Sequence, residues 1–231
     1  MEVTGPHHQP SDPSPAPPSD SEGVEAEKQA SVDGRSLRRE RNQEAVIVAL
    51  LELIREGNLD PATTDIADRA GVSHRSVFRY FDDLDDLVRQ AIEHEIADAV
   101  SLAALPNLGE GPLPRRIESL IDSRMRVYNH TQLVAQVARA RALSIPAVDV
   151  GMKGISQLFR DQLGEHFVSE LAHLEPGHRS DLLDAIQLAI NFESFDYNRR
   201  RFDRDDATIR RSWRIALTAL LTTNPPAGVA S

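Results

Sequence analysis

The sequence predicts an all-α protein: an N-terminal three-helix domain of the helix-turn-helix type, followed by a larger helical domain. Apolar residues recur at helical spacing along nearly the whole chain after Arg38, and no useful stretch shows the alternation of a β-strand. Proline and glycine gather in residues 105–114, where we place the domain boundary. With 231 residues, the chain is long enough to bury a sizeable core.

Residues 1–33 are predicted to be a disordered acidic, proline-rich tail. Seven acidic residues stand there against a single lysine, and six of the chain's 14 prolines lie there. With almost no large apolar side chain, this segment cannot bury enough surface to offset the entropy of ordering. Because the tail holds six of the ten excess negative charges, the rest of the chain is only mildly acidic and is compatible with a local basic face.

Residues 34–83 are predicted to hold three helices. The first follows Arg38, carries one broad apolar stripe and ends at Gly57-Asn58, a common C-terminal stop. The second begins with Thr63 as its N-cap. Gly71 then allows the positive φ of a turn before the third helix.

The third and fourth helices each have an N-cap of their own. Ser73 caps the third, whose inward residues Val77 and Phe81 are four positions apart. Asp83 caps the fourth, which occupies residues 84–104 and links the two domains. The aspartates around this start suit the positive end of the helix dipole, so capping explains the acidic cluster better than a metal site does.

The helices on either side of Gly71 predict a helix-turn-helix. The second helix of this motif enters the major groove of DNA, where its N-terminal residues contact base edges. Arginine bonds guanine through two hydrogen bonds, and hydroxyl groups and amides at a helix start suit phosphates. The candidate DNA-binding residues are Arg38, Arg39, Thr63, Thr64, Ser73, His74, Arg75, Ser76, Phe78, Arg79 and Tyr80.

Two of these candidates, Arg38 and Arg39, belong to the basic segment GRSLRRER. This segment precedes the first helix and offers an arm that can reach phosphates or a minor groove. A plainer interpretation of the motif also stays open. Arg75 and Arg79, four positions apart, would then form a solvated face on a small structural helix.

The stretch TTDIADRAGVSHRSVFRYFDDLDDL, residues 63–87, resembles the TetR family of transcriptional regulators. The order of parts, with a DNA-binding unit before a larger helical domain, is similar to that family as well. The resemblance implies a homodimer on a palindromic operator in double-stranded DNA, acting as a repressor that a small-molecule effector releases. The family pattern is matched by Asp65-Ile66-Ala67, Ala70-Gly71-Val72-Ser73, Phe78, Tyr80-Phe81 and Leu87.

Two positions depart from the family pattern. Phe78 stands where the family usually has a tyrosine whose hydroxyl contacts a phosphate, and Leu84 stands where it usually has a lysine. A missing cation beside added negative charge weakens binding to the DNA backbone. These departures keep an alternative open: a helical protein-interaction module that retains the helix-turn-helix shape but has lost DNA binding.

Residues 105–225 are predicted to form four or five longer helices of an effector-binding and dimerisation domain. A stripe from Ile117 to Tyr128 is followed by a break, and Pro146 ends this part. The remaining predicted segments are a helical stripe from Ile155 to Leu174, helices at 180–196 and 206–223, and a flexible C-terminus at 226–231.

The resemblance implies that the last two helices pair with those of a second copy, with an effector pocket among the preceding helices. Residues 180–196 are apolar over more than one face, which favours an oligomer contact, although a helix in the centre of a core would have the same apolar pattern. The candidate interface residues are Leu182, Ile186, Ala189, Ile190, Trp213, Leu217 and Leu220. The candidate pocket residues, which equally suit a core, are Met125, Tyr128, Phe159, Phe167, Phe192 and Phe195.

Two polar groups in this domain invite other interpretations. His166, Glu170 and His173 follow one helix edge at a spacing that suits metal ligands, but they border the apolar stripe, which favours an ordinary polar edge. The basic run at 198–201, with Arg204, is expected to be a solvated loop between the last two helices. We therefore expect neither a metal nor a cofactor.

Other classes of protein are disfavoured by what the sequence lacks. It has no cysteine, phosphate loop, nucleophile elbow or cofactor fingerprint, so an enzyme is not expected. No run approaches 18 apolar residues, and the N-terminus lacks the signal-peptide pattern, so we expect a cytoplasmic protein without a membrane partner.

Overall fold

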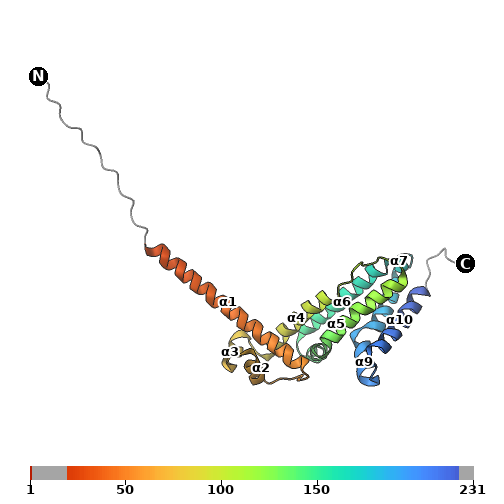
Figure 1. Ribbon diagram of the computed structural model, residues 1–231. Coiled ribbons are helices and arrows are strands. Elements are labelled where there is room, and N and C mark those ends of the chain that lie inside the picture. Colours follow the sequence, from red (N-terminus) through yellow and green to blue (C-terminus); the bar gives the residue numbers. More distant parts are fainter. Residues whose placement is uncertain (2–19, 224–231) are drawn as a thin grey trace. The chain divides into compact units, whose positions relative to one another are not determined.

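The structure is a computed structural model and describes residue 1 and residues 20–223. This part of the chain contains ten helices and no strand (Figure 1). The predicted all-α class is confirmed. None of the described helices has the length and apolar character needed to cross a membrane. The helices are α1 (Asp20–Arg55), α2 (Thr63–Ala70), α3 (His74–Tyr80), α4 (Leu84–Leu102), α5 (Leu113–Arg141), α6 (Pro146–His166), α7 (Val168–Leu171), α8 (Pro176–Ile190), α9 (Phe192–Phe202) and α10 (Asp206–Thr222).

Helix α1 begins earlier than the sequence led us to expect. Residues 20–33, which we assigned to the disordered tail, and the basic segment after them are helical. No proline lies between Pro18 and Pro61, and glutamate, alanine, glutamine and arginine are strong helix formers. Residues 1–42 form one unit and 43–231 another. The rest of the predicted tail, residues 2–19, and the predicted flexible C-terminus lie outside the described residues.

Two of the three predicted N-caps are confirmed. The Ser73 hydroxyl accepts a hydrogen bond from the amide of Ser76, and the Asp83 carboxylate accepts one from the amide of Asp86. Thr63 is not a cap, because it is the first residue of α2 and Ala62 holds the N-cap position without a side-chain bond. Gly71 has a φ of 67°, the left-handed conformation that the turn requires.

A first core joins the end of α1 with α2, α3 and the start of α4. Ile66, Val77 and Phe81 are buried in it, and residues from the end of α5 and the start of α6 complete it. Arg69 of α2 forms an ion pair with Glu56, which ties α2 to the segment after α1. The helix-turn-helix therefore rests on an apolar base that leaves one side of α3 exposed.

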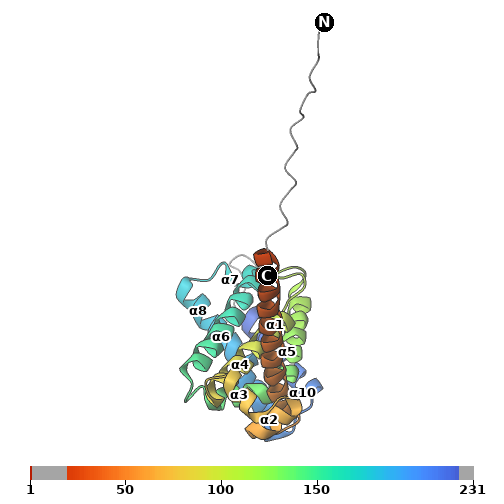
Figure 2. The same cartoon turned by 90° about the vertical axis from the view of Figure 1, so that its left-hand side faces the viewer.

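A second core fills the space among α5, α6, α8, α9 and α10. Helix α4 packs against both α5 and α6 (Figure 2) and contributes residues to both cores. Its early residue Leu87 belongs to the first core, and its late residue Ala99 belongs to the second. Helix α4 is therefore a continuous connection between the helix-turn-helix and the larger helical bundle.

Helix boundaries in the second half differ from those we predicted. Helix α5 continues through the expected break after Tyr128, and Pro146 begins α6 instead of ending a helix. The expected single helix through Leu174 ends at His166, and the short α7 follows. The expected helix 180–196 is divided at Asn191, whose side chain caps α9 by accepting from the Ser194 amide.

The predicted domain boundary at 105–114 falls largely in the loop between α4 and α5. The first core nevertheless includes Val134, Val137 and Val148 from beyond that loop. The division into a DNA-binding and an effector domain thus stays a prediction.

Candidate functional site

The N-terminal half of α3 presents polar side chains outward from a fixed base. Val77 and Phe81 are 2% and 3% exposed and hold the helix to the first core. His74 and Arg75, at the start of the helix, are exposed. Because the Ser73 cap orders the first turn, these side chains project from a defined backbone.

Two exposed arginines of α3 have no acidic partner. Neither Arg75 nor Arg79 takes part in an ion pair within the described part of the chain. Arg79 donates to the Tyr80 hydroxyl at 3.0 Å, which orients its guanidinium. Arg69 in α2 differs, because its guanidinium is already held by the Glu56 carboxylate at 2.8 and 2.9 Å. Within the helix-turn-helix, the positive charge available to an anionic partner therefore lies on α3.

The candidate DNA-binding residues of the motif differ in how far they are exposed: most are exposed, two are partly buried, and Tyr80 is buried. Tyr80 is 8% exposed, and its hydroxyl accepts from Arg79, so a contact between Tyr80 and DNA stays a prediction. The Arg79 guanidinium also lies over the Tyr80 ring, 5.1 Å from its centre. Phe78 is half exposed and its ring meets that of His74 edge-on at 5.0 Å. Thr64, Ser73, His74, Arg75, Phe78 and Arg79 are exposed, and Thr63 and Ser76 are partly buried.

The basic segment before the apolar part of α1 is helical, which corrects the expectation of an arm that precedes the first helix. Arg38 and Arg39 are exposed on it. The Ser36 hydroxyl donates to the Glu40 carboxylate at 3.1 Å, one helical turn away. A contact between these arginines and DNA stays a prediction.

The aspartates at the start of α4 serve as a cap, as predicted. Besides the Asp83 cap, Asp86 accepts from Arg89 at 2.6 Å and from Gln90 at 3.0 Å. Leu84, where we noted the departure from the family's lysine, is partly buried against the first core. The position that would supply a cation therefore supplies packing.

A second candidate site is a mainly apolar, partly open cavity of about 120 Å³ lined by α4, α5, α6, α8 and the start of α9. Three of the predicted pocket residues, Tyr128, Phe159 and Phe192, line it. The Tyr128 ring lies 5.8 Å from that of Phe192, and burial raises the pKa of its hydroxyl to about 12, so the group stays neutral. The other three candidates, Met125, Phe167 and Phe195, do not line the cavity and are buried in the second core.

The cavity wall contains a buried arginine that the sequence analysis did not single out. Arg124 is 1% exposed and lines the cavity. Its Nη1 donates to Gln162 Oε1 at 2.8 Å, and its guanidinium lies 4.0 Å from the centre of the Phe159 ring. Burial lowers the pKa of Arg124. Only its place beside Met125 in the predicted stripe could have drawn attention to it.

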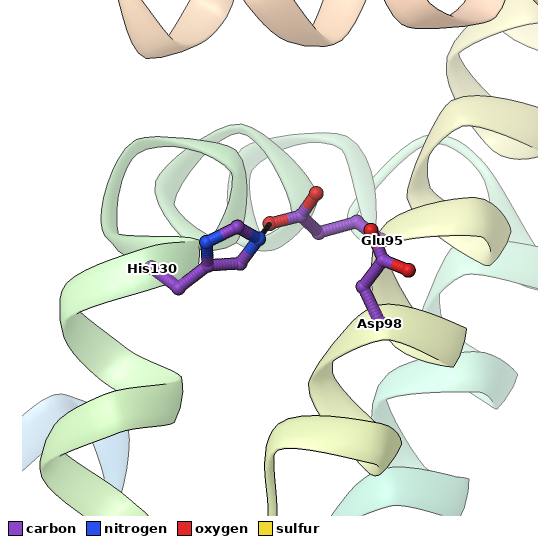
Figure 3. A group of neighbouring side chains, drawn as sticks. All are labelled: Glu95, Asp98 and His130. Atoms are coloured by element: carbon purple, nitrogen blue, oxygen red, sulfur yellow. Dashed lines mark ion pairs between the residues drawn. The ribbon is translucent and has the colours of Figure 1, made fainter.

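Glu95, Asp98 and His130 converge between α4 and α5 (Figure 3) and form the one group of possible metal ligands in the described part of the chain. Glu95 is buried, and burial raises the pKa of its carboxyl group. One carboxylate oxygen accepts from Arg55 at 2.5 Å, and the other lies 3.9 Å from His130 Nε2. Arg55 supplies a counter-charge to this carboxylate, whose other oxygen is buried without a hydrogen-bond partner.

The predicted polar edge is wrong for His166, which is fully buried. Its Nδ1 accepts from the Gly109 amide at 3.1 Å, and its Nε2 lies 2.9 Å from the Arg116 carbonyl oxygen. Burial lowers the pKa of His166, consistent with a neutral ring that donates from Nε2. Glu170 accepts from Arg116 at 2.5 and 2.7 Å. These groups are occupied in structural contacts.

The basic run at 198–201 is also placed differently from our prediction, because it lies in α9 and not in a loop. Arg199 pairs with Asp206 at the start of α10, and Arg200 donates to Gln136 at 3.0 Å. These arginines connect α9 with α5 and α10.

Most predicted interface residues lie inside a single chain. Large apolar side chains on a helix with several apolar faces pack into the nearest core, which here belongs to the same chain. The exposed apolar residues of these helices are instead Leu188 of α8 and Ile215 of α10, at 69% and 72% exposed. Leu182, Ile186, Ile190, Trp213 and Leu217 are buried, and Ala189 and Leu220 are partly buried.

Comparisons with known proteins agree with this arrangement. Residues 46–91 match the family model for bacterial regulatory proteins of the tetR family. Among solved structures, a transcriptional regulator from Rhodococcus sp. Rha1 has a similar fold, with a TM-score of 0.62, at 15% sequence identity over 78% of this chain and 96% of that chain. No curated protein matches the chain.

Proposed function

We propose that the chain is a transcriptional regulator of the TetR family, whose family model its residues 46–91 match, and that it is a repressor that binds a palindromic operator as a homodimer and is released by a small-molecule effector. The observation that carries the DNA-binding part is the exposed, unpaired state of Arg75 on an α3 that Val77 and Phe81 hold to the core. Such a helix can enter a major groove with its N-terminal residues toward the bases.

The chemistry of the α3 surface suits duplex DNA. Arg75 can bond a guanine edge, and the exposed hydroxyl of Thr64 at the start of α2 can bond a phosphate. Arg79, positioned by Tyr80, adds a second cation one turn along the helix. The net charge of −10 belongs to the whole chain and does not describe this local surface.

The test is a selection of random duplex DNA on the purified protein at moderate salt. We expect a palindrome to be enriched, and Arg75→Ala to lose about 1–3 kcal/mol of binding free energy at each half-site because one base contact is removed. The matched control is Arg69→Ala, which removes an arginine of the same motif that is engaged with Glu56. We expect its operator affinity to stay close to that of the unaltered protein.

Failure to enrich any sequence, or equal effects of the two substitutions, would refute the proposal for α3. The alternative of a protein-interaction module would then be favoured. Its specific support is Leu84, which packs against the core where a lysine is expected, among aspartates. Capture of protein partners would be the next experiment in that case.

For the homodimer, the support is an exposed apolar surface on the last helices. Helix α8 packs on α10, and Leu188 and Ile215 are large apolar side chains left in solvent on these two helices. Contiguous exposed apolar patches mark surfaces that contact another protein, and we propose that Leu188 and Ile215 belong to such a patch. We propose that they contact the same helices of a second copy, with a two-fold axis between them.

Ile215→Glu is expected to convert the dimer into a folded monomer, because it places a charge in an apolar contact. Analytical ultracentrifugation measures the mass, and circular dichroism checks that the helices remain. Leu143→Glu is the control, since Leu143 is 93% exposed outside these helices. A dimer that persists in Ile215→Glu would exclude this surface as the interface.

Helix α4 supports the proposed coupling between effector and operator. Its early residue Leu87 packs in the core of the helix-turn-helix, and Ile92 and Ile96 further along line the cavity. A ligand that displaces α4 would move α3 with it. Release then follows if the ligand binds more tightly to the state in which the two recognition helices no longer match one turn of DNA.

A further inference from the structure

The charged side chains that line the cavity are not all engaged in ion pairs. Glu95 accepts from Arg55 at 2.5 Å, and Arg139 donates to Glu193 at 2.6 Å. The remaining charged side chain in the wall is Arg124, which forms no ion pair with any described residue. Among the charged residues that line this cavity, Arg124 alone has no ion-pair partner in the described part of the chain, because Glu95 is paired with Arg55 outside the wall.

The same helix shows what a structural buried arginine looks like in this protein. Arg116 and Arg124 are eight residues apart on α5, and they are 4% and 1% exposed. Arg116 is bound by both oxygens of Glu170 and by two main-chain carbonyls. Arg124 has the neutral amide oxygen of Gln162 and a distant carbonyl of Phe159. A buried cation without an anion is unfavourable, and an anionic ligand would supply the partner that Arg124 lacks.

The surroundings of Arg124 keep it available to a ligand. Gln162 is fixed because its amide nitrogen donates to the Ala103 carbonyl at 2.9 Å, which directs its oxygen to Arg124. The Phe159 ring lies under the guanidinium plane at 4.0 Å. These contacts orient a planar fork of N–H donors, the geometry that binds a carboxylate through two hydrogen bonds.

We propose that the cavity binds a small organic monocarboxylate, whose carboxylate pairs with Arg124 and whose apolar body contacts Phe159, Tyr128 and Phe192. This inference rests on the proposed role of the cavity as the effector site and names the class of effector. The volume of about 120 Å³ limits the apolar body to about one ring or a short branched chain, since an apolar cavity of about 150 Å³ holds benzene.

The experiment compares each acid with its neutral amide. Benzoate, phenylacetate and 3-methylbutanoate are titrated into the full-length protein beside benzamide, phenylacetamide and 3-methylbutanamide, with melting temperature and calorimetry as readouts. We expect at least one acid to raise the melting temperature and to bind at least tenfold more tightly than its amide, because only the acid carries the charge that Arg124 lacks. Equal binding of acids and amides, or no binding of any acid, would overturn the proposal.

The variant Arg124→Met separates a ligand-binding arginine from a structural one. It keeps the length and apolar volume of the side chain and removes the unpaired charge. We expect this variant to lose the preference for acids over amides, which is at least tenfold in the unaltered protein. Its melting temperature should equal or exceed that of the unaltered protein. The control is Arg116→Met, which should lower the melting temperature. If Arg124→Met lowers it as much, Arg124 is structural and the proposal fails.

Operator affinity, measured with and without the acids, separates this inference from the function on which it rests. Acids that bind through Arg124 and weaken operator binding support both. Acids that bind through Arg124 but leave operator affinity unchanged support the carboxylate site and refute release by this ligand. Operator binding by a protein that binds no acid supports the DNA-binding function and refutes the carboxylate site.

Discussion

Replacement of Arg116 by methionine is expected to lower the free energy of unfolding by about 3–5 kcal/mol, because it breaks a buried ion pair and leaves one charge behind. Arg116 donates to both oxygens of Glu170, at 2.5 and 2.7 Å, and to the carbonyls of Gly111 and His166 at 3.1 and 2.8 Å. Urea unfolding followed by circular dichroism measures the change.

A double replacement distinguishes the loss of the ion pair itself from the cost of a buried charge that remains without a partner. Arg116→Met together with Glu170→Met should recover most of the stability, since a buried pair replaced by apolar side chains is often neutral or stabilising. The control is Arg214→Met, which breaks the exposed pair with Glu118 and should cost much less, because water screens that interaction. A single replacement of Arg116 that costs no more than this control would contradict the buried-pair interpretation.

The helix-turn-helix could be predicted from sequence because its signals are local. Ser73 and Asp83 bond to amides three residues away, and Gly71 adopts the positive φ that its turn requires. Each signal acts within one turn of its own chain, so no tertiary information is needed. The exposure of Arg75 followed from the inward positions of Val77 on the same short helix and of Phe81 at its C-cap.

The second half was harder to predict because its boundaries depend on packing between distant segments. The expected break after Tyr128 is absent, and there Thr131 bonds back to the Val127 carbonyl within an unbroken α5. Asn191, in contrast, divides a predicted helix because its side chain caps α9. An asparagine follows Tyr128 as well, so the residue type alone does not decide the outcome.

The two buried arginines of α5 could not be told apart from sequence either. Arg116 and Arg124 both look like polar positions beside an apolar stripe. Their difference lies in Glu170, which is 54 residues from Arg116 and reaches it only in the folded chain. An arginine becomes a candidate ligand-binding residue when its burial and its lack of an acidic partner are both known, and neither is a local property.

Trp213→Ala is expected to lower the free energy of unfolding by about 3–5 kcal/mol, because it leaves a large cavity in a core that cannot close around it. We predicted from sequence that Trp213 lies in a dimer interface, but it is 2% exposed within one chain, and its ring meets that of Tyr128 edge-on at 6.1 Å. Urea unfolding of the variant measures the loss, and Leu143→Ala, at a side chain in solvent, should change the stability by less than about 0.5 kcal/mol.

The mass of the Trp213→Ala variant then decides between core and interface. A core residue should weaken folding of each protomer while the folded fraction remains dimeric, because the exposed Ile215 contact is untouched. An interface residue should instead produce a monomer with nearly normal protomer stability. One turn of α10 carries both the buried Trp213 and the exposed Ile215, so the two substitutions are expected to give opposite results. Trp213→Ala should destabilise the protomer without dissociating the dimer. Ile215→Glu should dissociate the dimer without unfolding the protomer. Dissociation caused by Trp213→Ala would mean that the face of α10 assigned to the core is the one that meets the second copy.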